Sequence, residues 1–273
     1  MTDSPKTLNT PATPDSSDTN HPANRAEVRV VAYRGDVALD AARLFTACAK
    51  AAVAKRSRCA VALSGGSTPP LLFQMLAGNG TVEFVASVPW PHLHVFWGDE
   101  RHVPPTDPQS NYRMARETLL DHVPIPSAQI HRMPAEDPDA AGAARAYEAA
   151  IRADFNLDDD GVPVFDIMLL GMGTDGHTAS IFPGSTVLGE RDRLVVAPWV
   201  PRLETYRLTM TPPVILGART TIVLVSGADK ADALHSAIED ADDPARCPIQ
   251  ILRRSSGRVV WIVDRAAAAR LRA

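Results

Sequence analysis

The chain has 273 residues, of which 45% are apolar and 22% charged, an ordinary balance for a soluble globular protein. The net charge of −4, with no basic stripe, argues against nucleic acid as a partner. No apolar run is long enough to cross a membrane, residues 1–5 lack a signal pattern, and three cysteines offer no disulfide framework. We therefore expect a cytoplasmic protein with no membrane partner.

Residues 1–24 are rich in Pro, Ser, Thr, Asn and Asp and hold almost no large apolar side chains. Such a segment buries too little surface to order itself, so we predict a disordered tail over 1–24 and one domain over 25–273. In chain order, the patterns predict a strand over 28–33, a helix over 36–55 capped by Asp36, a strand over 59–63 and a helix over 69–76. These are followed by a strand over 92–97, a helix over 110–122 that starts at Asp107 or Ser110, a short strand over 129–133 and a helix over 138–154.

The second half continues the alternation. We predict strands over 164–170, 194–197, 206–211, 221–226 and 259–263, and helices over 212–216, 228–238 and 264–271. Several of these strands are continuous apolar runs, which is typical of parallel strands buried on both faces. The pattern therefore predicts a single α/β domain with a mostly parallel, Rossmann-like sheet covered by helices on both faces.

The turn that follows the apolar run at 164–170 is the most informative segment of the chain. Asp175 and His177 stand two residues apart in it, among glycines. Open α/β sheets bind ligands at the carboxyl ends of their strands, so we expect chemistry at this turn. A plain glycine turn with a surface histidine would not account for the clustering of these polar residues at a strand end.

The same turn matches the dinucleotide-binding spacing of glycines, at positions 171, 173 and 176. That fingerprint requires a long helix after the glycines, with its N-terminus against the pyrophosphate. Pro183 and Gly184 end any helix here within two turns. We therefore expect no nucleotide cofactor.

Two further strand ends carry polar loops. Residues 64–69 combine two glycines with hydroxyls directly before a helix, an arrangement that suits a phosphate but also describes an ordinary capped turn. The predicted ligands in this loop are Gly65, Gly66, Ser67 and Thr68. In residues 98–102, Arg101 could bind a phosphate or carboxylate through two parallel bonds and Asp99 could hold sugar hydroxyls, although a solvated charged turn is the alternative.

A fourth strand end precedes Lys230, one of only four lysines among 28 basic residues. A cation in the first turn of a helix is disfavoured by the helix dipole unless an anion lies nearby, so Lys230 is a candidate phosphate ligand or else a surface cation. Since all four loops follow strands, one shared site explains them best. His92 and His94 lack a spaced acidic or cysteine partner, and residues 158–160 are typical of a solvated turn, so we expect no metal. Ser64 and Ser67 do not stand in the G-x-S-x-G elbow of serine hydrolases.

Taken in order, these segments resemble the 6-phosphogluconolactonases. The resemblance extends over about residues 27–272, and its matching pieces are LSGGSTP at 63–69, WGDERHVP at 97–104, SNY at 110–112, LGMGTDGHTASIFP at 170–183, RLTMT at 207–211 and GADK at 227–230. The related glucosamine-6-phosphate deaminases share two of these loops but resemble one another in a glutamate at the position of Phe182. Phe182 cannot relay protons, which favours the lactonase. A sugar-phosphate sensor is the remaining alternative, and intact Asp175 and His177 argue against it.

The resemblance implies hydrolysis of 6-phospho-D-glucono-1,5-lactone to 6-phospho-D-gluconate in the oxidative pentose phosphate pathway, without a cofactor or a metal. It implies that His177 is the general base, and that Asp175 either orients His177 or binds sugar hydroxyls. The phosphate would bind the 65–68 loop, Arg101 and Lys230. Arg207 and the loop N–H groups are candidates to bind the developing oxyanion.

Overall fold

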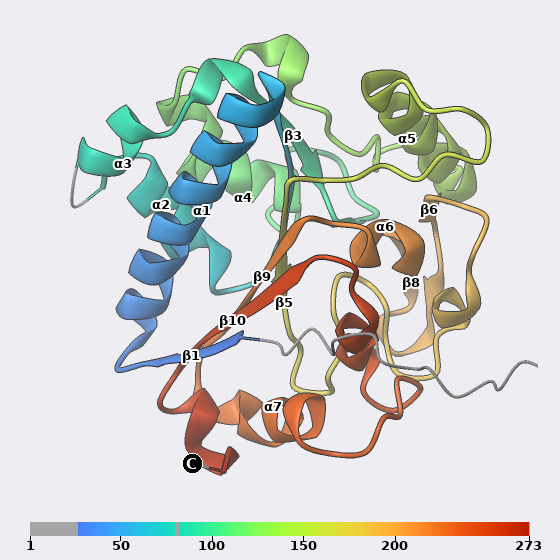
Figure 1. Ribbon diagram of the computed structural model, residues 1–273. Coiled ribbons are helices and arrows are strands. Elements are labelled where there is room, and N and C mark those ends of the chain that lie inside the picture. Colours follow the sequence, from blue (N-terminus) through green and yellow to red (C-terminus); the bar gives the residue numbers. More distant parts are fainter. Residues whose placement is uncertain (1–26, 80–81, 273) are drawn as a thin grey trace, which may run out of the picture.

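The structure is a computed structural model that describes residues 27–79 and 82–272. The disordered tail predicted over 1–24 lies outside the described residues, and the predicted domain limits stay a prediction. Six strands form one all-parallel sheet in the order β1-β10-β9-β5-β2-β3 (Figure 1). Their bounds are β1 Glu27–Val31, β2 Cys59–Leu63, β3 Leu93–Trp97, β5 Ile167–Gly171, β9 Thr220–Val225 and β10 Arg258–Asp264.

Helices cover both faces of this sheet, as the sequence predicts (Figure 1). The first helices lie on one side, with α1 at Arg34–Arg56, α2 at Pro69–Leu76, α3 at Val82–Ser87 and α4 at Asn111–Thr118. On the other side lie α5 at Ala140–Phe155, α6 at Pro212–Leu216 and α7 at Ala231–Ile238. None of the helices within 27–79 and 82–272 combines the length and the apolar character needed to cross a bilayer.

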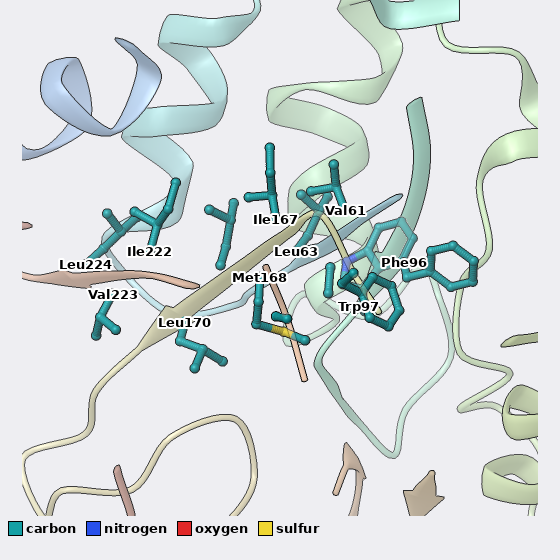
Figure 2. Packing of buried hydrophobic residues seen from close by; sticks show 14 of the residues in the cluster. Val61, Leu63, Phe96, Trp97, Ile167, Met168, Leu170, Ile222, Val223 and Leu224 are labelled. Atoms are coloured by element: carbon teal, nitrogen blue, oxygen red, sulfur yellow. The ribbon is translucent and has the colours of Figure 1, made fainter. Parts of the chain in front are cut away.

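The central strands are buried on both faces. Along β5 and β9, Ile167, Ile222 and Leu224 point to one face, whereas Met168 and Val223 point to the other (Figure 2). All five of these side chains are at most 2% exposed. Burying each of them stabilises the fold by about 1.5–3 kcal/mol, which fixes the central strands as a rigid support for the loops at their ends.

The order of the strands creates a topological switch point between β2 and β5. From β2 the chain crosses to β3 at the sheet edge. It then returns past β2 to β5 and continues in that direction to β9 and β10. Loops at the carboxyl ends of strands that flank such a point diverge and leave a crevice. The loops after β2 and β5 are residues 64–68 and 172–178, the two segments that the sequence singles out most strongly.

A second, antiparallel sheet was not predicted. It has the order β4-β8-β6, from Asp99–Arg101, Thr205–Met210 and Val195–Val196, and β7 at Trp199–Val200 also pairs with β8. Residues 99–101, which were expected to be part of a loop, thus form strand β4. Segments of two or three residues are too short to show an alternating pattern, so no periodicity indicates β4 or β7.

Several predicted boundaries were wrong. Asp36 is not the N-cap of α1: Tyr33 is, and Asp36 accepts from the Tyr33 N–H three positions into the helix. Residues 129–133 form no strand, only a single bridge from Ile130 to Val95. Residues 264–271 contain only a short 3-10 helix, Ala267–Arg270, and a 3-10 turn, Ala228–Lys230, precedes α7. The predicted N-cap Ser110 of α4 is confirmed, since its hydroxyl accepts from the Arg113 N–H.

Candidate active site

The four loops converge on one cavity of about 210 Å³ at the carboxyl end of the parallel sheet. Of the residues predicted to form the site, eight line this cavity: Gly65, Gly66, Ser67, Thr68, Asp99, Arg101, His177 and Lys230. Two predicted residues, Asp175 and Arg207, do not line it. Residues without a prediction also contribute to the wall, among them Ser64, Met172 and Ser226.

Asp175 and His177 form a close pair within the turn after β5. Asp175 Oδ1 lies 2.5 Å from His177 Nδ1 and 3.2 Å from the His177 backbone nitrogen. Gly173 makes this packing possible: a Cβ atom there would lie 1.9 Å from His177 Nδ1 and 2.6 Å from Asp175 Oδ1. Only glycine at position 173 leaves room for the pair.

The pairing fixes which nitrogen of His177 is free. Burial opposes ionisation of Asp175, but the hydrogen bond from His177 and the nearby charges outweigh it and hold the pKa of this carboxyl well below its usual range. An ionised carboxylate only accepts, so Nδ1 of His177 must carry the hydrogen. In the neutral ring, Nε2 then has the lone pair and can take a proton.

Arg202, which was not predicted to belong to the site, contacts Asp175 through the oxygen that His177 does not use. Arg202 Nη1 forms an ion pair with Asp175 Oδ2 at 2.6 Å. The same guanidinium lies over the ring of Phe182, 4.4 Å from its centroid, and that ring packs on His177 with centroids 4.4 Å apart. Asp175 therefore bonds His177 through Oδ1 and pairs with Arg202 through Oδ2, a contact that is an ion pair without a hydrogen bond.

Asp99 is buried, and its oxygens accept hydrogen bonds from other segments of the site. Its Oδ2 accepts from Ser180 Oγ at 2.8 Å, and its backbone oxygen accepts from Asn111 Nδ2 at 2.9 Å. The Ser180 backbone nitrogen in turn donates to Thr209 Oγ1 of β8. These bonds tie the turn after β5 to the small sheet, so the predicted sugar-binding Asp99 is in part a structural link between two walls of the cavity.

The cationic side chains gather around the cavity from both sheets. Arg101 and Arg207 are cross-strand partners in β4 and β8. Burial, with a smaller contribution from Arg101, lowers the pKa of the Arg207 guanidinium, which still leaves it charged at neutral pH. Lys230 Nζ lies 3.7 Å from the exposed carboxylate of Asp229, a weak pairing that leaves its charge available to an anion.

Three supporting residues were not predicted to have a role in the site. Glu100, 3% exposed, accepts from the backbone nitrogens of Arg101, Asn111 and Tyr112 and from Ser110 Oγ, and so anchors the start of α4.

Asn111 lines the cavity against Gly65, and its Oδ1 is buried without a hydrogen-bond partner among the described residues. Asp264 accepts from the Gly227 N–H and the Ser226 hydroxyl, which fixes the loop that leads to Lys230.

A histidine cluster with the spacing of metal ligands lies away from the cavity. The sequence suggested no acidic partner for His94, but Asp154 Oδ1 lies 2.8 Å from His94 Nδ1 and 3.4 Å from His131 Nε2. The two imidazole rings stack with their planes within 10° of each other. Arg58 also pairs with Asp154. These contacts describe a hydrogen-bonded ion cluster. His92 lies in a 3-10 turn before β3 and not in the strand predicted to start there.

Comparison with known proteins identifies the family. The model of a family described as "Glucosamine-6-phosphate isomerases/6-phosphogluconolactonase" matches residues 33–261. The chain belongs to this family. A relative named 6-phosphogluconolactonase from Synechocystis sp. is 40% identical over 221 residues, which cover 81% of this chain and 88% of the relative. One of the same name from Mycobacterium tuberculosis is 40% identical over 226 residues, with the same coverage.

Solved structures in the family share the fold. The 6-phosphogluconolactonase from Trypanosoma brucei superposes with a TM-score of 0.80 at 31% identity, over 90% of this chain and 99% of that one. A monomeric glucosamine-6-phosphate deaminase superposes with a TM-score of 0.74 at 20% identity. At that identity the second likeness shows the fold alone. The resemblance and the α/β fold read from the sequence are therefore confirmed.

Proposed function

We propose that this chain hydrolyses 6-phospho-D-glucono-1,5-lactone to 6-phospho-D-gluconate, the lactonase step of the oxidative pentose phosphate pathway. The observation that carries the proposal is the composition of the cavity. A histidine oriented by a carboxylate stands in the same small cavity as two cationic side chains, Arg101 and Lys230, and a glycine-rich loop. This combination suits a substrate that has an anionic phosphate at one end and an electrophilic carbonyl at the other.

At the phosphate end, we assign binding to the 65–68 loop, Arg101 and Lys230, which all line the cavity. Guanidinium groups bind phosphate oxygens through paired, charge-assisted bonds, and an ammonium supplies a compact charge. The loop lies between the end of β2 and the start of α2, so its N–H groups and the helix dipole favour an anion.

At the carbonyl end, we assign the general base to His177. Its Nε2 takes a proton from water as the water oxygen attacks C1 of the lactone. Collapse of the tetrahedral intermediate breaks the bond between C1 and the ring oxygen, and the imidazolium returns its proton to that oxygen. We assign Asp175 to orienting His177 rather than to binding sugar hydroxyls, because Asp175 stands outside the cavity wall and both of its oxygens are engaged.

A substrate panel tests the reaction class. Wild-type protein is incubated with the phosphorylated lactone, with unphosphorylated glucono-1,5-lactone and with glucosamine 6-phosphate. We expect acceleration of hydrolysis for the phosphorylated lactone, a much lower kcat/KM without the phosphate, and no ammonia from the amino sugar. Ammonia release would favour the deaminase, and binding of 6-phosphogluconate without any turnover would favour a sensor.

A further inference from the structure

The hairpin that carries Arg202 reaches from the small sheet to the turn that holds the proposed base. Strands β7 and β8 pair through Trp199 with Tyr206 and Val200 with Thr205, and the tip between them is a short 3-10 turn, Pro201–Leu203. The residue after this turn, Glu204, has φ 47°, and this left-handed conformation reverses the chain. The tip is thus a defined structure rather than a free loop.

Arg202 closes a ring of four side chains that includes His177. The guanidinium pairs with Asp175 Oδ2 on one side and stacks on Phe182 on the other. Asp175 bonds His177 Nδ1, and Phe182 packs against the His177 ring. Arg202 therefore contacts both groups that hold the imidazole, Asp175 and Phe182.

We propose that Arg202 is a positioning residue for His177, and that its charge sets the pH range in which His177 acts as a base. The proposal rests on the proposed function only for the kinetic part of its test. Because Arg202 pairs with Asp175 Oδ2, it holds in place the carboxylate whose Oδ1 orients the imidazole ring. Its positive charge also offsets the negative charge of Asp175, which would otherwise favour the protonated imidazolium.

The other charged groups near His177 come from several elements. Asp99 and Arg101 of β4 and Lys230 before α7 line the same cavity. Asp232, Asp240, Asp243 and Arg246 line a separate cavity that Asp175 also lines. Arg202 is distinguished from all of these by its direct ion pair with the oxygen of Asp175 that His177 does not use.

The size of the effect follows from the geometry. One carboxylate separates the guanidinium from the imidazole, with contacts of 2.6 and 2.5 Å on its two sides. At that separation, loss of one positive charge shifts a titration midpoint by roughly 0.5 to 1.5 pH units, depending on the local dielectric. The sign is upward, because the imidazolium gains stability when the neighbouring cation is removed.

The test compares Arg202→Gln, Arg202→Lys and Phe182→Leu with wild type by two readouts. One is the pH profile of kcat for the lactone. The other is the NMR titration of the His177 imidazole, whose signal is identified by its absence in His177→Asn. Arg145→Gln is the matched control, since Arg145 is a similarly exposed surface arginine in one ion pair, with Asp139, in α5.

We expect Arg202→Gln to raise both midpoints by roughly 0.5 to 1.5 pH units, Arg202→Lys to restore them, and Phe182→Leu to lower kcat without moving them. Arg145→Gln should leave both readouts at the wild-type values. The proposal is overturned if the midpoints of Arg202→Gln and Arg145→Gln coincide, even where kcat falls. Since the NMR titration needs no turnover, it decides the proposal even if the lactonase assignment fails. Arg202 is 51% exposed, so its substitutions should not prevent folding.

Discussion

Substitution of Gly173 by alanine tests the geometry of the proposed base directly. A Cβ atom at this position would lie 1.9 Å from His177 Nδ1, whereas ordinary van der Waals contact begins at 3.4 Å. The imidazole must therefore retreat by about 1.5 Å, which breaks its 2.5 Å bond to Asp175. The backbone itself tolerates alanine, because Gly173 does not have a positive φ.

The expected loss of kcat equals the contribution of general base catalysis, which depends on the hydrogen bond between His177 and Asp175. General base catalysis contributes about 10²- to 10⁴-fold, so we expect kcat for Gly173→Ala to fall by that factor, or by about 3 to 5 kcal/mol of transition-state stabilisation. Affinity for 6-phosphogluconate, measured by calorimetry, should change little because the phosphate ligands lie on other loops.

Gly189→Ala is the matched control, since a Cβ atom there meets nothing within 4 Å. It should retain wild-type kcat and thermal stability. The reasoning is refuted if folded Gly173→Ala keeps a kcat within about threefold of wild type, because the His177–Asp175 contact would then not matter for the chemistry.

Three further substitutions test other parts of the account. Lys230→Ala should weaken binding of 6-phosphogluconate by roughly 10- to 100-fold in calorimetry, and an unchanged Kd would remove Lys230 from the phosphate site. Asp154→Asn should lower the free energy of unfolding in urea by about 1–3 kcal/mol at pH 7. Burial opposes ionisation of Asp154, but the imidazoles and Arg58 hold the pKa of its carboxyl well below the usual value. The difference in the free energy of unfolding between wild type and Asp154→Asn should therefore close as the pH falls below about 4. A difference that is constant with pH would contradict the role of the Asp154 charge. Glu100→Gln should lower the free energy of unfolding by about 2–4 kcal/mol, because the amide nitrogen presents a donor to N–H and O–H groups that already donate. A loss below about 0.5 kcal/mol would contradict the role of Glu100 as the acceptor at the start of α4.

The parts of the fold that could be predicted are those with a local cause. The predicted bounds of β2, α2 and α6 match the structure because apolar runs, prolines and turn residues mark both of their ends. The four polar loops could be assigned to one site because parallel strands bring their carboxyl ends to one edge.

What could not be predicted depends on contacts between distant segments. Asp154 stands 60 residues after His94, so no spacing in the sequence joins them. No local pattern distinguishes Arg202 from the other arginines, because it reaches Asp175 only through the fold of the β7–β8 hairpin. Asp264, expected to start a helix, instead accepts from the loop before Lys230, because its strand ends beside β9.

The most direct test of the central claim is hydrolysis of the lactone by wild type and by His177→Asn, against a sample without protein. The lactone is generated in situ and its loss followed by NMR, because it also opens spontaneously. We predict that wild type accelerates the loss and that His177→Asn removes most of the acceleration while leaving 6-phosphogluconate affinity nearly unchanged. Loss at the rate of the blank in the wild-type sample would contradict the lactonase assignment, and near-normal kcat in His177→Asn would contradict His177 as the base.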